Sequence, residues 1–564
     1  MRLNAVAKTM AASAAALLIA GCGGGGSDPG AVVLSGTAAT GAALANASVE
    51  VKCAAGSGTA TTSTSGGYSV TVSGGKLPCI VKVSGTTGGG VAVTLHSVAE
   101  SGTAAGGNTN ATANVTPITE MIVAQLMAAL PADAFATFNP GQVTQAALEA
   151  AAETIVAALK TAGIDLAGID PLKDELVPPS GNNAGNAYDQ LLDKLGDTVG
   201  PEALPLVVSQ IANAATTKSS EGLNTAIQAV AGGAMEGCPV AVSGTYRSIE
   251  YWGKTVVRKI DFKAGTLKTG DRDPVAITLN PDKPCTFTAT GPVGDQTGEI
   301  EVAFGPQGIG TFRSRFINPD TLGVVGWIFP VQSHGVAAVT GEWDFLQSGY
   351  IPGDPVSHYA GKLAFGSDGK VGVCEYDEAF VCQKDDEGTM SIVAGSDGGI
   401  VLQDSLGEGA KLYAYKSPNG ALTVFGTTNP EGINTMEQEQ TSIVATRLSA
   451  QTLPALNSVS KYNETQLFRF FDSGTSTYKF GTDPISSNST TVIAVDSAAG
   501  SFTRKRASDG REDTQIINKP ITGTRYREAG TLPGTIQIPL AGATVIINSD
   551  PTRQHFYAIA VGRP

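Results

Sequence analysis

Seven cysteines and four histidines are the side chains of this 564-residue chain best suited to covalent or metal chemistry. Cys22 stands near the start, and the other six thiols could form disulfides, bind zinc or act as nucleophiles. The sequence has no CxxC pair and no His beside a Cys, which disfavours a zinc site and a thiol nucleophile. The even count instead predicts disulfides, and position along the chain favours three pairs: Cys53 with Cys79, Cys238 with Cys285, and Cys374 with Cys382.

Catalytic motifs are absent from the sequence. The Gly-x-Ser-x-Gly nucleophile elbow is missing, because no Ser has Gly both two residues before it and two residues after it. There is also no HExxH, Walker or Rossmann motif. The four histidines, too few for a multi-His centre, are His96, His334, His358 and His555. We therefore predict no catalytic residues, no metal and no cofactor.

One segment resembles a catalytic motif. Residues 471–476, with Asp472 followed by Ser-Gly-Thr, are similar to the catalytic strand-turn of pepsin-type aspartic proteases. Those enzymes need two Asp that share a proton, and this chain contains no second copy of the motif. Because Asp-Ser-Gly is also ordinary turn chemistry, we expect Asp472 to be structural.

Two charged segments were considered as binding sites. The acidic stretch 374–387 could supply oxygen ligands to Ca²⁺, but its spacing matches no EF-hand, and a solvated hairpin is favoured. The run Arg504-Lys505-Arg506 is followed by Asp509, Glu512 and Asp513. We interpret this run as an exposed, charge-balanced hairpin rather than a binding patch.

The N-terminal residues predict export. Residues 1–21 combine two early cations with a short Ala-rich apolar centre, the layout of a signal peptide. Leu18 to Cys22 resembles the bacterial lipobox, which implies that Cys22 is lipidated and begins the mature chain. Gly23 stands where an Asp would favour the inner membrane, so we expect an outer-membrane location on either face. Residues 22–30 are Gly-rich and are expected to form a flexible tether.

Composition limits the classes of partner. There are 37 Lys and Arg against 51 Asp and Glu, a formal net charge of −14. Phosphate backbones attract basic surfaces, so nucleic-acid binding is not expected. The length suggests three or four domains, and 42% hydrophobic residues are enough to form cores. The expected partners are therefore the membrane, through the lipid, and an unidentified ligand or protein.

Residues 31–114 have the short alternating segments of an all-β domain. Expected strands are Ala47–Cys53, Tyr68–Ser73, Ile80–Ser84 and Val91–His96. Ser35-Gly36, residues 41–51 and residues 64–70 resemble the carboxypeptidase regulatory-like domain, although Ser65 stands where that family usually has an acidic residue. The resemblance implies a transthyretin-like β-sandwich without an active site.

Residues 115–236 change to helical spacing and predict a helical bundle. Pro117 behind Thr116 marks one helix start, and Gly196 marks one helix end. About five helices are expected, including residues 142–162, 204–215 and 223–230.

Residues 237–564 predict a large antiparallel β-rich domain. Three short elements recur, which indicates a threefold internal repeat unless the similarity arose by chance. The first is Gly244-x-Tyr246, Gly341-x-Trp343-x-Phe345 and Phe468-x-Phe470; the second is Ile260-x-Phe262, Leu363-x-Phe365 and Ile493-x-Val495; the third is Gly298-x-Ile300-x-Val302, Gly388-x-Met390-x-Ile392 and Gly534-x-Ile536-x-Ile538. A barrel, a propeller or stacked sandwiches would all fit. Gly341-x-Trp343 also resembles the opening strand of lipocalins and avidins. The alternative is a Trp that packs at the floor of any barrel or sheet.

Together these observations predict a lipid-anchored cell-envelope protein with a non-catalytic binding or surface-interaction role. The C-terminal half, residues 237–564, is the expected receptor. The alternative is a hydrolase of an envelope or extracellular polymer that uses carboxylates of this half. Two inward-facing acidic residues that converge in one cleft would favour the hydrolase, whereas a smooth apolar cavity or a flat aromatic patch would favour binding.

Overall fold

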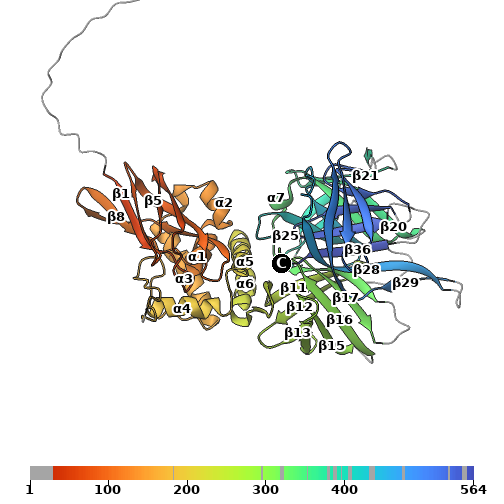
Figure 1. Ribbon diagram of the computed structural model, residues 1–564, viewed down its shortest axis with the longest axis horizontal. Helices are drawn as coiled ribbons and strands as arrows, with labels where there is room; N and C mark the ends of the chain where they lie inside the picture. Colours follow the sequence, from red (N-terminus) through yellow and green to blue (C-terminus); the bar gives the residue numbers. More distant parts are fainter. Residues whose placement is uncertain are drawn as a thin grey trace, which may run out of the picture.

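The computed structural model describes residues 30–563 except for 182, 294–295, 318–322, 352–353, 378–380, 385–389, 396, 404–408, 431–438, 473–476, 531, 533 and 549–555. Two sheets and the helices packed beside them form one end of the molecule, and three barrels form the other end (Figure 1). The chain is therefore mostly β and has several structural units.

The first unit consists of two four-stranded sheets that share a core. One sheet has the order β4-β1-β8-β7, and the other has the order β3-β2-β5-β6. The strands are β1 (Val32–Thr37), β2 (Ser48–Ala55), β3 (Ser57–Thr61), β4 (Gly67–Val72), β5 (Lys76–Thr86), β6 (Ala92–Ala99), β7 (Thr103–Ala105) and β8 (Asn108–Thr112). Buried valines of both sheets, such as Val49 and Val70, alternate with exposed residues, as expected for strands with one face in a core. The four expected strands correspond to β2, β4, β5 and β6.

Residues 117–232 form helices close to the expected positions. They are α1 (Pro117–Met127), α2 (Pro131–Ala136), a short 3₁₀ turn (Pro140–Gln142), α3 (Gln145–Thr161), α4 (Ala187–Gly196), α5 (Leu204–Thr217) and α6 (Ser220–Gly232). The α1 helix begins as predicted, because the Thr116 side chain accepts a hydrogen bond from the Thr119 backbone N–H and Pro117 occupies the first turn.

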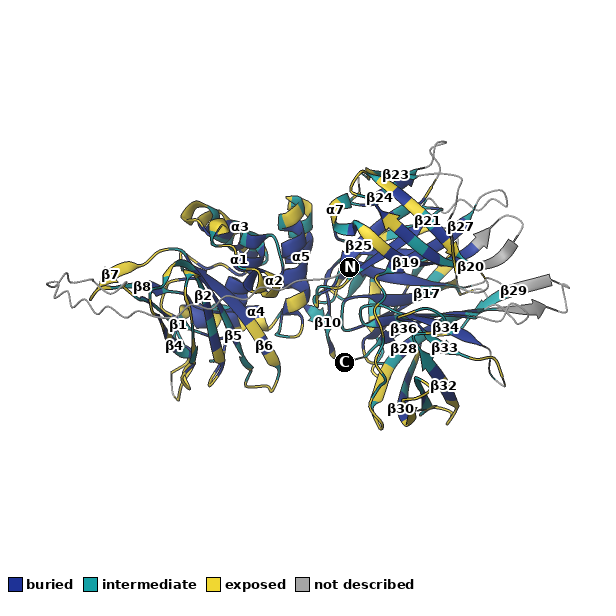
Figure 2. Ribbon diagram, turned by 90° about the horizontal axis from the view of Figure 1, so that it is seen from above, coloured by how far each residue is buried: buried dark blue, intermediate teal, exposed yellow. Residues whose placement is uncertain are grey.

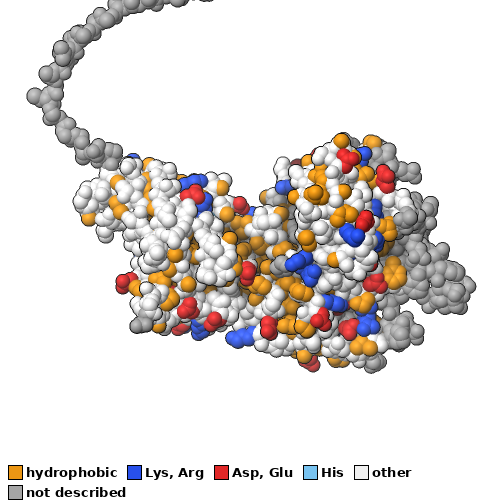
Figure 3. Space-filling model, viewed as in Figure 1, with side chains coloured by type: hydrophobic (Ala, Val, Ile, Leu, Met, Phe, Trp, Pro, Cys, Tyr) orange, Lys and Arg blue, Asp and Glu red, His pale blue; other side chains and the backbone are white. Residues whose placement is uncertain are grey.

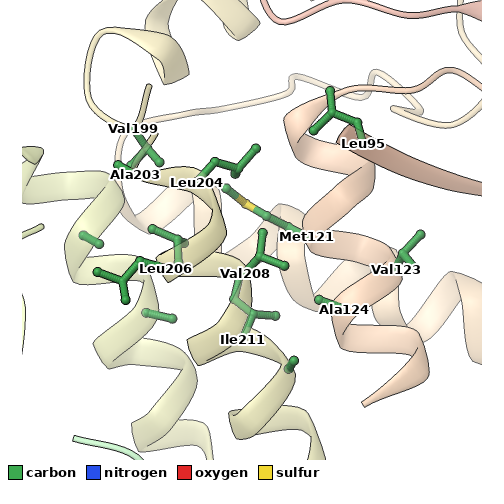
Figure 4. Close-up of a cluster of buried hydrophobic side chains, with 14 of the residues drawn as sticks. Leu95, Met121, Val123, Ala124, Val199, Ala203, Leu204, Leu206, Val208 and Ile211 are labelled. Carbon is green, nitrogen blue, oxygen red and sulfur yellow. The ribbon is translucent and has the colours of Figure 1, made fainter. Parts of the chain in front are cut away.

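The helices do not form a separate bundle core. Met121 and Ala124 of α1 lie toward Val208 and Ile211 of α5 (Figure 4), and the same buried cluster includes the interior of the two sheets. His96 of β6 joins α1 directly, because its Nδ1 lies 3.0 Å from Oε2 of buried Glu120. Sheets and helices are therefore packed on one continuous core.

Helix α5 also contacts the barrels. Its buried face lies between the sheets and the barrels (Figure 2). The Asn213 side chain donates to the Ser333 carbonyl at 2.7 Å and accepts from the Ser333 N–H at 3.0 Å, while Ser209 Oγ donates to the Lys416 carbonyl at 2.9 Å. These bonds fix the helical layer against the C-terminal half.

The first barrel is a closed ring of eight consecutive antiparallel strands. They are β11 (Gly244–Glu250), β12 (Thr255–Asp261), β13 (Thr266–Thr269), β14 (Val275–Leu279), β15 (Thr286–Val293), β16 (Gln296–Phe304), β17 (Gly310–Phe316) and β18 (Val324–Pro330). A two-stranded sheet of β9 (Ala234–Met235) and β10 (Cys238–Val242) precedes the ring. The short helix α7 (Val336–Val339) follows it.

The second barrel closes through the pairing of β20 with β21, which leaves β22 outside the ring. Its strands are β19 (Gly341–Ile351), β20 (Asp354–Phe365), β21 (Lys370–Tyr376), β22 (Cys382–Lys384), β23 (Met390–Ala394), β24 (Ile400–Gln403), β25 (Lys411–Lys416), β26 (Leu422–Thr427) and β27 (Gln440–Thr446). Trp343 is buried in the core of this barrel, and its Nε1 donates to the Val339 carbonyl at 2.6 Å.

The third barrel closes through the pairing of β28 with β36, which leaves β29 outside the ring. Its strands are β28 (Val459–Asp472), β29 (Thr477–Thr482), β30 (Ser486–Asp496), β31 (Ser501–Arg506), β32 (Glu512–Ile517), β33 (Arg525–Arg527), β34 (Thr535–Pro539), β35 (Ala543–Asn548) and β36 (Phe556–Gly562). The β-rich half is thus a series of three barrels.

The three short sequence elements only partly follow the barrels. The second element falls at the end of the second ring strand in each barrel, on β12, β20 and β30. The third element falls on the sixth ring strand in the first and third barrels, β16 and β34, but on the fourth ring strand in the second barrel, β23. The elements therefore do not mark equivalent positions throughout.

Large apolar side chains join the outer faces of the barrels. Trp327 of the first barrel donates through Nε1 to the Tyr557 hydroxyl of the third barrel at 3.0 Å. Phe329 of the first barrel stacks on Phe425 of the second barrel, with ring centroids 4.2 Å apart. These residues belong to the same buried cluster as the sheets and helices.

Candidate functional site

The interior of the third barrel is polar, whereas the other two interiors are mainly apolar. The first barrel also holds buried Arg258, which donates to Ser248 and Thr269. The first barrel encloses Tyr246, Ile260, Leu267, Phe287, Val302, Phe304, Phe312 and Ile328. The second encloses Trp343, Phe345, Leu363, Phe365, Val371, Leu402, Leu412 and Val424. The third contains a cavity of about 610 Å³ whose wall includes four arginines, two carboxylates and several amides and hydroxyls. It is therefore the candidate site.

The third barrel also has an apolar outer face where it meets its neighbours. Leu467, Val545 and Ile559 belong to the large buried cluster. On β35, Ile546 lies between Val545 and Ile547 and lines the cavity instead. Burying the outer face against the other barrels leaves the polar face of the sheet to line the interior.

Strand alternation brings two arginines into the cavity from β31. Arg504 and Arg506 line it, and only 18% and 16% of their side-chain surfaces are exposed. Lys505 points outward, with 52% exposed. The expectation of an exposed hairpin is therefore wrong for the two arginines and holds only for Lys505. Successive side chains of a strand point to opposite faces, and this alternation was the sequence signal for the site.

An ion network behind the cavity wall fixes two of the arginines. Arg504 donates to both oxygens of Asp513, at 2.8 and 3.2 Å, and Arg527 Nη1 donates to Asp513 Oδ2 at 3.0 Å. Gln515 Nε2 donates to the same oxygen at 2.9 Å. Burial alone would raise the pKa of Asp513, but the bonds and charges of Arg504 and Arg527 outweigh it and hold this pKa below its ordinary value. Asp513 therefore stays ionised.

The other two arginines of the wall, Arg506 and Arg511, lie outside the Asp513 network. Arg506 Nε lies 3.3 Å from Asp509 Oδ1, whose side chain is half exposed, and this Nε has no hydrogen-bond acceptor in the described part of the chain. Arg511 lies in the β31–β32 turn and is exposed. Ser486 and Ser508, which also line the cavity, are exposed as well. These residues mark the side from which a ligand could enter.

Glu464 of β28 contributes a carboxylate to the same wall. Burial raises its pKa above the ordinary value, although the nearby arginines, Arg506 foremost, oppose this rise. On the same strand, the Gln466 amide donates to Asp483. Glu464 therefore presents an acidic group that can accept a hydrogen bond, or donate one when it is protonated.

The cysteines lie away from this cavity. The structure contains the three favoured disulfides, Cys53–Cys79, Cys238–Cys285 and Cys374–Cys382. The first joins β2 to β5, the second joins β10 to the chain just before β15, and the third joins β21 to β22. Cys22 lies outside the described residues, so its lipidation stays a prediction.

The other sequence candidates contribute little to the described site. Asp472 is the last residue of β28, and the Ser-Gly-Thr that follows it lies outside the described residues. The acidic stretch is described only in part, because positions 378–380 and 385–389 are not. In the described segments, no three His, Cys, Asp or Glu side chains are grouped as a metal site would require.

One Ser–His pair was not anticipated. Ser348 Oγ lies 2.8 Å from His358 Nδ1, because the two residues face each other across the β19–β20 hairpin. The His358 ring also stacks near Tyr557, with centroids 6.3 Å apart, and burial lowers the pKa of His358 to about 3. Ser348 is 1% exposed, and neither residue lines the cavity of the third barrel. The pair therefore connects the second barrel with the third.

Neither the surface in view nor the helices add a second candidate site among the described residues. Acidic and basic side chains are interspersed on the face shown in Figure 3. Among the described residues, no helix has the length and apolar character needed to cross a bilayer.

No protein-family model matches this chain, and no curated protein is similar to it. Among solved structures, a protein of unknown function from the DUF3598 family of Nostoc punctiforme is 9% identical, with a TM-score of 0.15; the match covers 40% of this chain and 96% of that one. Transferrin binding protein B from Neisseria meningitidis is 10% identical, with a TM-score of 0.19, and the match covers 57% of this chain and 76% of that one.

Transferrin binding protein B from Haemophilus parasuis, solved as a double mutant, is 12% identical, with a TM-score of 0.17. That match covers 55% of this chain and 65% of the other. TM-scores this low establish neither a shared fold nor a shared function.

Proposed function

We propose that this protein is a lipid-anchored, non-catalytic binding protein of the bacterial cell envelope, and that its third barrel is the receptor. The observation that carries the binding role is the polar cavity of about 610 Å³ inside that barrel. Small-molecule sites are concave and range from about 300 to 1,000 Å³. The neighbouring barrels, whose interiors are mainly apolar, act as its support.

The buried charges favour binding over hydrolysis. Two carboxylates that act as general acid and base should face one cleft. Two carboxylates, Glu464 and Asp483, do face the cavity of the third barrel, and Asp483 accepts from Gln466. Four arginines line the same wall, and this excess of cations suits the recognition of an anion, which favours the receptor role.

The anchoring part of the proposal rests on the lipobox-like segment that ends at Cys22. In Cys22→Ala the acylated thiol is missing, so the protein should leave the membrane fraction or stay unprocessed. Cell fractionation and intact-mass measurement of the wild type and the variant test this. An unmodified Cys22 in the mature wild type would refute the anchor but leave the binding role standing.

The receptor role predicts that a ligand stabilises the folded protein only when the cavity is open. Gln537 lines the cavity and is 2% exposed, so Gln537→Trp should fill part of it. Lys505→Trp adds the same bulk to the outer face of the barrel and serves as the control. The measurement is thermal unfolding of the wild type and both variants with a panel of sugars, amino acids and phosphate compounds. At least one compound should raise the Tm of the wild type and of the control but not that of Gln537→Trp. If no compound in the panel behaves in this way, the receptor role is refuted.

A further inference from the structure

The cavity of the third barrel has a positive charge balance inside an acidic protein. Four arginines line its wall: Arg504, Arg506, Arg511 and Arg527. Two carboxylates line it, Glu464 and Asp483, while Asp509 pairs with Arg506, and Asp513 pairs with Arg504 and Arg527. The whole chain has a formal net charge of −14, so this excess of cations is local. A cavity with low-dielectric walls concentrates such a field and favours an anion.

The arginines differ in how far they are available to a ligand. Asp513 already binds Arg504 and Arg527. Arg506 lines the cavity; its buried Nε lies 3.3 Å from Asp509 Oδ1 but makes no hydrogen bond within the described segments. Arg511 lies exposed at the mouth. A guanidinium recognises a carboxylate through two parallel N–H donors. Arg506 and Arg511 are therefore the expected contacts for a ligand carboxylate.

The rest of the wall suits hydroxyl groups and one apolar face. Amides and hydroxyls come from Gln466, Ser486, Ser487, Asn488, Ser508 and Gln537. Tyr462, Ile546 and Phe556 add apolar surface. Amides and hydroxyls can both donate and accept, which matches a molecule with many hydroxyls. An aromatic ring suits the C–H face of a pyranose.

We propose that the ligand of the third barrel is an acidic saccharide, a sugar whose carboxylate is bound by Arg506 and Arg511 and whose hydroxyls are bound by the amides, hydroxyls and Glu464. This inference rests on the proposed receptor role. A cationic sugar fits less well, because the arginines around Glu464 would repel an ammonium group placed beside that carboxyl. A hydroxyl at Glu464 meets no such repulsion.

The test uses sugars of similar size that differ in charge: D-glucuronate, D-glucose and D-glucosamine, with inorganic phosphate as a simple anion. Isothermal titration measures their binding to wild type, Arg506→Gln, Arg511→Gln and Lys505→Gln. Lys505 is the matched control, because it neighbours Arg506 on β31 and loses the same charge on the outer face. We expect glucuronate to bind the wild type at least tenfold more tightly than the other three compounds. Arg506→Gln should weaken glucuronate binding at least tenfold, Arg511→Gln should also weaken it, and Lys505→Gln should leave it unchanged.

Several results would overturn the inference without touching the receptor role. Equal binding of glucose or glucosamine would show that the carboxylate is not recognised. Equal binding of phosphate would show that the site takes any small anion. Absence of glucuronate binding, while another compound of the panel stabilises the wild type but not Gln537→Trp, would assign the cavity to a different ligand class. Should Arg506→Gln fail to fold, Arg511→Gln at the exposed mouth keeps the role of the arginines testable.

Discussion

Adjacent residues of the third barrel lie in opposite environments, because a strand turns successive side chains to opposite faces. On β32, Asp513 is buried and accepts from two arginines, whereas its neighbour Glu512 makes a half-exposed pair with Lys505. Both carboxylates appear in the sequence as partners of one basic run. The structure gives them different roles: Asp513 positions cavity residues, and Glu512 lies at the surface.

Asp513→Asn should therefore destabilise the protein, by about 3 kcal/mol, because it leaves two buried guanidinium groups without their carboxylate. Glu512→Gln, the control, should cost no more than about 0.5 kcal/mol. The pKa of Asp513 is lowered in the folded state, so its contribution is present above the ordinary Asp pKa and is lost as the pH falls through the folded-state value. Urea unfolding from pH 7 down to pH 3 measures both effects. Equal unfolding free energies of the two variants at pH 7 would contradict the network.

At the scale of elements, the disulfides connect neighbouring segments. Cys53 and Cys79 face each other on the paired strands β2 and β5, and Cys374 and Cys382 close the β21–β22 hairpin. Cys238–Cys285 closes a longer loop, since its residues are 47 positions apart against 8 for Cys374–Cys382. It ties the β9–β10 sheet to the wall of the first barrel.

The longer loop should make Cys238–Cys285 the more stabilising disulfide. In the chain-entropy model, replacing both of its cysteines with Ser should cost about 4 kcal/mol, against about 2.5 kcal/mol for Cys374 and Cys382. Chemical unfolding of the two double variants under oxidising conditions measures the difference. Peptide mapping without reductant is the control, since free thiols in the wild type would refute the pairings. A larger loss for the shorter loop would contradict the loop-length argument.

At the scale of the whole molecule, the barrels behave as one packed assembly rather than as independent modules. Trp327 hydrogen-bonds to Tyr557 and packs at a tilt against Phe425, with ring centroids 5.4 Å apart, so one side chain of the first barrel contacts both other barrels. Helix α5 extends the same core to the sheets. The polar cavity is thus held in a barrel whose outer wall is supported by its neighbours.

Trp327→Ala should loosen all three barrels, with a loss of about 3–5 kcal/mol for a buried aromatic side chain. Trp343→Ala is the matched control, because Trp343 lies inside the second barrel alone. Hydrogen exchange followed by mass spectrometry separates the two: Trp327→Ala should speed exchange in all three barrels, and Trp343→Ala mainly in the second. Faster exchange confined to the first barrel in Trp327→Ala would show that the barrels unfold independently.

The sequence by itself determined the local features of this protein. The Thr116 cap, the helix end at Gly196 and the β character of residues 237–564 depend on neighbouring residues, so the pattern contains them. Only the tertiary structure decided that the β half closes into barrels, because closure depends on distant pairings such as Leu467 with Tyr557. It also decided that Arg504 and Arg506 face inward. A local pattern suggests that the polar face of a strand meets water, but in the third barrel the apolar face packs against the other barrels and the polar face lines the cavity.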